Sequence, residues 1–142
     1  HILMWALKER DEKKKNGGED TDHQVSIDEE LSSALEEMRG SSGGVRYICV
    51  LNSQGNLLAM SDAEKDFMEI LEPYLDPVYC FVNEYPQGHT GKAFIETEDV
   101  SIALSGIKKG TTVVIATGPE VKLGRLSMAL GKITRELGEK RM

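Results

Sequence analysis

The stretch GKAFIETEDVSIALSGIKKGTTVVIATGPEVKLGRLSMALGKITREL, residues 91–137, decides the fold that the sequence predicts. A two-residue turn at Glu98 and Asp99 folds its first part into a β-hairpin. In that register one face of the hairpin is almost wholly apolar, with the cross-strand pairs Thr97 and Val100, Ile95 and Ile102, and Ala93 and Leu104. A slip of one residue would turn these side chains to the opposite face, so the pattern predicts this register.

The rest of the stretch predicts a buried strand and an amphipathic helix. Thr111–Thr117 carries apolar residues on both faces, which is typical of a central strand. Pro119 suits the first turn of the helix that follows. The apolar residues of this helix recur every three or four positions: Leu123, Leu126, Leu130, Ile133 and Leu137. We therefore expect the sheet and this helix to pack together.

Composition indicates one domain that needs no disulfide, because 142 residues suffice to bury a sizeable core. Cys49 and Cys80 lack CxxC or metal-ligand spacing and are predicted to be reduced core thiols, which favours a cytoplasmic protein. A net charge of -7 argues against general nucleic-acid binding. No apolar run approaches the ~18 residues of a membrane span. We expect no signal peptide, because charge begins at Lys8.

Residues 1–24 differ from the rest, and we expect a flexible charged tail ahead of a folded domain at 25–142. Trp5 and Leu7 are the exception and offer a contact to a surface or partner groove, although a solvated tail is the preferred interpretation. Met4 is a candidate natural start, which would make the three residues before it a remnant.

Two capping boxes predict helix starts, one at Ser26 with Glu29 and one at Ser61 with Glu64. The first helix ends at Gly40. Its apolar residues recur at helical spacing: Ile27, Leu31, Ala34, Leu35 and Met38.

The second helix is more apolar than one sheet face requires, with Phe67, Met68, Ile70, Leu71, Tyr74, Leu75, Val78, Phe81, Val82 and Tyr85. Pro73 and Pro77 each remove a hydrogen bond within it. We therefore expect a kink or break between Glu72 and Asp76, with Asp76 capping a second piece.

Between the first two helices lie two strands, Val45–Leu51 and Asn56–Met60, joined by a turn. Val45–Leu51 lacks a polar face, so it belongs beside Thr111–Thr117 at the centre of the sheet. The predicted fold is α+β, a two- to three-layer α/β sandwich with element order αββαβββα and an antiparallel sheet ordered 2-1-5-4-3. The third strand, Gly91–Thr97, then lies at an edge with unpaired backbone groups.

The sequence carries no catalytic, nucleotide-binding or metal-binding motif, so we predict no catalytic residue, no cofactor and no metal site. His89 is interpreted as a residue of a solvated loop and Cys49 as a buried thiol. The Gly40–Gly44 cluster is a candidate anion cradle, but a plain connector is preferred. For Arg46, structural pairing with an acid is preferred over contact with a partner.

Two small basic clusters, Lys108-Lys109 and Lys122 with Arg125, are interpreted as a turn and a solvated helix face.

The order and spacing of these segments resemble the roadblock dynein-light-chain family, whose prokaryotic branch includes regulators of small Ras-like GTPases. The resemblance spans Ile27–Leu137. It rests on GGVRYICVLNSQGNLLA at 43–59, IKKGTTVVI at 107–115 and KLGRL at 122–126. It implies a five-stranded sheet with the first and third helices on one face and the second on the other.

The resemblance also implies a homodimer, in which third strands pair edge to edge and second helices lie together. Pro73 and Pro77 depart from the family pattern, in which the second helix is continuous. The implied interface comprises Lys92, Phe94, Ile95 and Glu96 of the third strand with Phe67, Leu71, Tyr74, Val78 and Phe81 of the second helix.

The function that follows is a non-enzymatic, cytoplasmic homodimeric adaptor or regulator whose partner is a small GTPase. No contact with nucleic acid and no membrane insertion are expected. Alternatives remain open: a longin- or profilin-like module or small-ligand sensor, and least of all an enzyme that uses His89.

Overall fold

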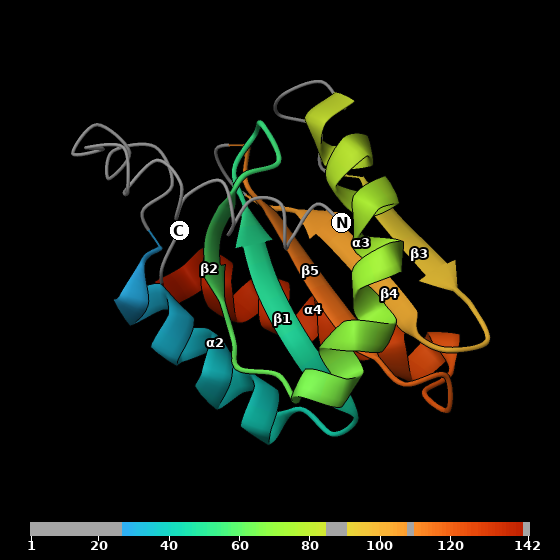
Figure 1. Cartoon of the computed structure of the whole chain (residues 1–142). Helices are drawn as coiled ribbons and strands as arrows, with labels where there is room; N and C mark the ends of the chain where they lie inside the picture. The colour runs from blue at the N-terminus through green and yellow to red at the C-terminus, as the bar shows by residue number, and fades with distance from the viewer. Residues whose placement is uncertain (1–26, 85–90, 108–109, 141–142) are drawn as a thin grey trace.

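The computed structural model describes residues 27–84, 91–107 and 110–140. These contain three helices and five strands (Figure 1), with the bounds α2 Glu29–Ser41, β1 Val45–Leu51, β2 Leu57–Met60, α3 Lys65–Glu84, β3 Lys92–Glu96, β4 Ser101–Gly106, β5 Thr112–Thr117 and α4 Leu123–Lys140. The predicted residues 1–24, Ser26, Tyr85, His89, Lys108 and Lys109 lie outside the described residues.

The strands form one antiparallel sheet in the order β2-β1-β5-β4-β3, so the predicted fold class and strand order are confirmed. Helices α2 and α4 cover one face and α3 covers the other (Figure 1). Strands β1 and β5 lie at the centre, as their two apolar faces predict.

Alternate residues of β1 lie in two separate cores, one on each face of the sheet. Tyr47, Cys49 and Leu51 belong to the core beneath α3, whereas Ile48 and Val50 belong to the core beneath α2 and α4. This alternation is the period-two geometry of a strand that is buried on both sides. The sheet therefore holds both helical layers in place.

The predicted β3–β4 register is confirmed, with Ala93 opposite Leu104 and Ile95 opposite Ile102. Thr97 closes the turn between these strands. Its N–H donates to the Val100 carbonyl over 3.0 Å, and its Oγ1 accepts from the Val100 N–H over 2.9 Å. Turn chemistry and apolar alternation thus select one register together.

The N-terminal cap of α2 corrects the predicted capping box. The cap is Asp28, whose carboxylate accepts a hydrogen bond from the Leu31 N–H over 2.8 Å. A carboxylate here satisfies one of the free N–H groups of the first turn and suits the positive end of the helix dipole. The helix ends at Ser41, one residue beyond the predicted Gly40.

The start of α4 was also predicted too early. Pro119 lies in a turn before the helix, which begins at Leu123. Leu123 is 47% exposed and not part of the buried stripe, whereas the other four predicted stripe residues are fully buried. Val121, in the turn, is buried in place of Leu123.

Helix α3 is one continuous helix, so the predicted break between Glu72 and Asp76 is wrong, as is the predicted cap at Asp76. Pro73 and Pro77 are both exposed. On the solvent side, water can satisfy the carbonyls that a proline leaves without a donor, which lowers the cost of an interior proline.

Three further predictions are corrected in α3 and in the residues before it. Ser61 does not cap this helix, because its Oγ accepts a hydrogen bond from the Ile48 N–H of β1 over 2.9 Å. Cys80 is exposed on α3, so only Cys49 is a core thiol; both are free, as predicted. Asn56 precedes β2 and is not part of it.

Candidate interface at the open sheet edge

Helix α2 covers the outer edge of β2. Two backbone groups of β2 and one just beyond it find partners on α2 or its cap at intervals of four residues. The Leu58 carbonyl accepts from the Asp28 N–H at 2.8 Å, the Met60 N–H donates to Ser32 Oγ at 3.1 Å, and the Asp62 N–H, two residues after β2, donates to Glu36 Oε1 at 2.8 Å. Four helical residues rise ~6 Å and two strand residues ~6.8 Å, so the two repeats match over this length. This edge is closed to a second strand.

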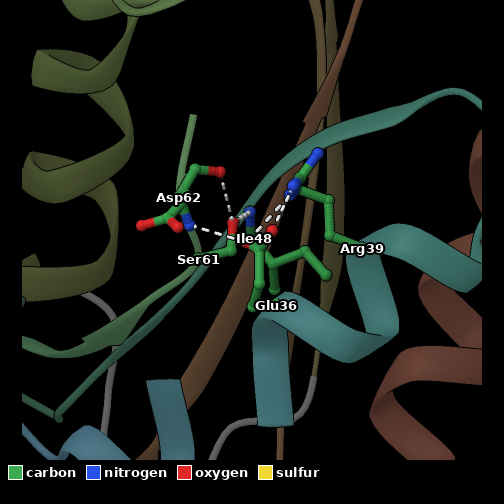
Figure 2. Close-up of polar contacts among 5 residues, drawn as sticks. All are labelled: Glu36, Arg39, Ile48, Ser61 and Asp62. Carbon is green, nitrogen blue, oxygen red and sulfur yellow. Dashed lines mark hydrogen bonds and ion pairs between the residues drawn. The ribbon is translucent and has the colours of Figure 1, made fainter. Parts of the chain in front are cut away.

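The last of these contacts belongs to a polar junction between α2, β1 and the end of β2 (Figure 2). Glu36 Oε1 also accepts from Arg39 Nε over 3.0 Å, and the second carboxylate oxygen pairs with the same guanidinium. Ser61 Oγ donates to the Asp62 carbonyl over 3.2 Å. The hydrogen bond from Arg39 is the main cause that lowers the pKa of Glu36. The junction therefore holds elements together.

Arg46 anchors the start of α3 on β1, so the predicted structural pairing is confirmed. Its guanidinium pairs with Glu64 Oε1 over 3.0 Å and lies 4.3 Å from the centre of the Phe67 ring. A cation over a ring face adds to an ion pair that water would otherwise weaken. Arg46 thus contacts both Glu64 and Phe67 at the surface of the chain.

The edge formed by β3 has no such cover. Hydrogen bonds to β4 at Gly91 and Thr97 fix the alternation of the ladder, so Ala93 and Ile95 face β4 with their backbone groups. Lys92, Phe94 and Glu96 direct theirs away from the sheet. In the part of the chain that the structure describes, these outward groups have no backbone partner, and Figure 1 shows β3 at the outside of the sheet.

An apolar stripe runs along α3: Ile70, Pro77 and Phe81 are exposed, and Tyr74 between them is half-buried. Steps of four, three and four residues place these side chains on one flank of the helix. Ile70 is 46% exposed and Phe81 is 37% exposed. Tyr74 donates from its hydroxyl to Asp99 in the β3–β4 turn over 2.9 Å. The stripe therefore lies on the flank of α3 nearest to β3.

The implied interface residues divide into two groups. Phe67, Leu71 and Val78 are buried against the sheet within the chain itself. Tyr74, which is half-buried, and the exposed Phe81 lie on the apolar stripe, together with Ile70 and Pro77, which the sequence analysis did not select.

On β3 the four implied residues differ in exposure. Lys92 and Glu96 are exposed, and Phe94 and Ile95 are half-buried. The open edge of β3 and the apolar stripe on α3 lie next to each other. Together they form a candidate protein interface.

The described residues offer neither a candidate metal centre nor a candidate membrane span. They contain no group of three or more His, Cys, Asp or Glu side chains able to hold a metal ion. None of the described helices has the length and apolar character needed to cross a bilayer.

Comparison with known proteins places the fold. Neither a family sequence model nor a curated protein sequence matches the chain. Among solved structures, the Roadblock/LC7 domain from Streptomyces avermitilis matches at a TM-score of 0.56 with 17% identity, over 75% of this chain and 96% of that one. MglB in a tetrameric arrangement matches at 0.54 with 13% identity, over 78% and 87%.

A profilin matches nearly as well. LokiProfilin1, solved in complex with rabbit actin, reaches a TM-score of 0.51 with 13% identity, over 80% of this chain and 97% of that one. Identities this low establish the fold alone. The chain therefore has the roadblock fold, a layout that profilins share.

Proposed function

We propose that a chain with this fold, one covered edge and one open edge is a homodimeric adaptor or regulator, and that its partner is a small Ras-like GTPase. The open edge of β3 beside the apolar stripe on α3 carries the proposal. Unpaired strand edges invite pairing with another chain, and this fold covers the opposite edge but not this one.

A two-fold axis at Phe94 satisfies the open edge. Two antiparallel copies of β3 then pair through the outward groups of Lys92, Phe94 and Glu96, and the two sheets become one. In that register Lys92 faces Glu96 of the partner subunit. Opposite charges across a strand pair contribute ~0.2–1 kcal/mol, whereas a register shifted by two residues loses the match.

The same axis brings two α3 helices together along the apolar stripe. Ile70, Tyr74 and Phe81 would lie at the centre of this contact. Aromatic and large aliphatic side chains are typical of the buried core of an interface. The proposal thus explains why Ile70 and Phe81 are exposed in one copy.

Analytical ultracentrifugation of the purified chain tests the dimer. We expect a mass twice the 15.7 kDa of one chain at micromolar concentration. Ile70→Asp and Phe81→Asp should both yield monomers. Met128→Asp is the matched control, because Met128 is 76% exposed on α4 in the opposite layer. A monomeric wild type, or stripe variants as dimeric as the control, would refute the dimer.

The GTPase partner rests on the likeness of fold to MglB and roadblock domains. Immobilised wild-type chain should retain a small GTPase from native extract, more strongly in one nucleotide state than in the other. Mass spectrometry identifies the retained protein, and purified components then give its rate of GTP hydrolysis. Absence of any GTPase under both GTPγS and GDP would overturn this part of the proposal.

A second candidate, a profilin-like module that binds an actin-like protein, is favoured by the match to LokiProfilin1. Co-sedimentation with actin and inhibition of actin polymerisation separate the two candidates. A monomer that retains actin monomers supports the second; a dimer that binds no actin supports the first.

A further inference from the structure

A groove lies on the layer of α2 and α4, away from α3. It has a volume of about 600 Å³ and is lined by the end of α2, the loop that follows and the middle of α4, namely Ser41, Ser42, Gly43, Ser127, Met128, Ala129, Gly131, Lys132 and Arg135. Ligand sites for small molecules typically occupy ~300–1,000 Å³, so the groove has the size of one.

The groove is cationic in an acidic protein. Lys132 and Arg135 line it, no acidic residue does, and the chain as a whole carries a net charge of -7. From Lys122 to Arg135 the sequence contains four basic residues and no acid. In the described part of the chain, neither Lys132 nor Arg135 forms an ion pair. Local charge therefore favours an anion here.

Ser42 supplies a hydroxyl that lacks a partner. The residue is only 7% exposed, and its Oγ forms no hydrogen bond with any of the described residues. Its backbone is already engaged, since its N–H donates to the Arg39 carbonyl at 3.3 Å and its carbonyl accepts from the Val45 N–H at 3.1 Å. Buried polar groups without a partner are uncommon and point to a missing ligand or water.

Two glycines line the groove. At Gly43 an added Cβ would lie 3.7 Å from a guanidinium nitrogen of Arg125, so a third cation lies beside the loop. At Gly131 an added Cβ would meet nothing within 4 Å. The backbone of α4 is therefore accessible from the groove.

We propose that this groove binds a phosphate monoester of a small molecule. Lys132 and Arg135 would neutralise the phosphate, and the Ser42 and Ser127 hydroxyls would donate to its oxygens. Met128 and Ala129 would contact the apolar part of the molecule. The groove lies on the face opposite the stripe on α3, so its function does not depend on the proposed dimer.

Titration of the ¹⁵N-labelled full chain with phenyl phosphate tests the proposal by NMR. We expect saturable shifts at the amides of Ser42, Gly43 and Gly131. Inorganic phosphate as a second ligand separates recognition of the free ion from recognition of an ester, and phenylacetate separates phosphate from carboxylate. Tighter binding of phenyl phosphate than of either supports the proposal. Equal or tighter binding of phenylacetate, or of inorganic phosphate, overturns it.

Groove-filling provides the sharpest variant. Gly131→Leu places a side chain in open space and should weaken phenyl phosphate at least 10-fold. Gly124→Leu is the matched control, since a Cβ there also meets nothing within 4 Å and Gly124 does not line the groove. Binding unchanged by Gly131→Leu, or lost equally in both variants, refutes the site.

Charge reversal gives an independent test. Lys132→Glu should weaken phenyl phosphate about 10-fold, whereas Lys65→Glu on α3 makes the same change in net charge and should leave binding unchanged. Equal losses in the two variants would show that only the overall charge matters, which overturns the proposal.

Discussion

The two outer strands of the sheet, β2 and β3, differ in whether their outward backbone groups have hydrogen-bond partners. Along β2, helix α2 contributes the Asp28 N–H, the Ser32 hydroxyl and the Glu36 carboxylate to the outward backbone groups. Along β3, the outward groups of alternate residues lack such partners in the described residues. The β2 edge is therefore closed to a further strand, and the β3 edge is open to one.

The difference separates an edge that the chain covers with its own helix from an edge that it leaves open to a second chain. Proteins usually blunt exposed strand edges with charge, proline, bulges or covering elements. This chain uses a covering helix on β2, so it has the means to close an edge. The outward backbone of β3 has only the exposed charges of Lys92 and Glu96 to blunt it, and with the exposed Ile70 and Phe81 nearby it is the surface on which the proposed dimer rests.

The largest effect should come from proline at the open edge. Lys92→Pro removes an N–H that faces outward and leaves the ladder with β4 intact, which is where edge strands tolerate proline. In a symmetric dimer two hydrogen bonds disappear and the ring crowds the partner strand. We expect the dimer dissociation constant to rise about 100-fold, or roughly 2.8 kcal/mol, by analytical ultracentrifugation.

Lys92→Ala is the matched control for this edge, because it removes the side chain and keeps the N–H. It should weaken the dimer by less than ~1 kcal/mol, the upper value for a cross-strand charge pair. If proline and alanine have the same effect, the backbone of β3 does not form the contact. The open edge would then not explain the dimer.

The next largest effect should come from removing the α2 side chains that cover the edge of β2. Ser32→Ala combined with Glu36→Ala removes both side-chain acceptors from β2, and each lost hydrogen bond costs ~1 kcal/mol net. We expect the free energy of unfolding to fall by about 2 kcal/mol in urea titration. Ser33→Ala, an exposed position on the same helix, is the control. A double variant as stable as the control would show that α2 does not protect this edge.

The sequence predicted the parts of this contrast that depend on local patterns. The β3–β4 register followed from a short turn between Thr97 and Val100 and from apolar alternation. The edge position of β3 followed separately, from the two strands that are apolar on both faces and so lie at the centre. The sequence did not predict that α2 covers the edge of β2. This cover depends on how the helix lies beside the strand, which local sequence patterns do not specify. Neither Ser32 nor Glu36 belongs to the apolar stripe of this helix, so periodicity alone gives them no contact with the sheet.

The candidate site was predicted in part for a related reason. Apolar residues extend around more than the sheet-facing side of α3, and periodicity alone does not tell which flank the sheet covers. Phe67, Leu71 and Val78 were selected but lie in the core, while Ile70 and Pro77 were overlooked. Exposed prolines at positions 73 and 77 also show that a helix interior tolerates proline where solvent replaces the lost donor.

The cap of α2 gives a smaller effect and separates capping from edge cover. Asp28→Ala removes the carboxylate that accepts from Leu31 but keeps the N–H that donates to Leu58. We expect a loss of about 1 kcal/mol in the free energy of unfolding. Asp28→Asn should retain most of that stability, because an amide oxygen also caps. A loss well above 2 kcal/mol would show that the backbone contact to β2 breaks as well.

The smallest effect concerns charge at the junction on the closed edge. Arg39 lowers the pKa of Glu36 below its usual 4.5, so the folded state is stabilised above that pH and loses this contribution as the pH falls through the lowered value. Glu36→Gln keeps an oxygen for the Asp62 N–H but forms no ion pair. Wild type should therefore exceed this variant in stability at pH 7, and the difference should shrink below pH 4.5 in urea titrations. A difference that is constant from pH 7 to pH 3 would mean that the ion pair adds nothing, and that α2 closes this edge through neutral hydrogen bonds alone.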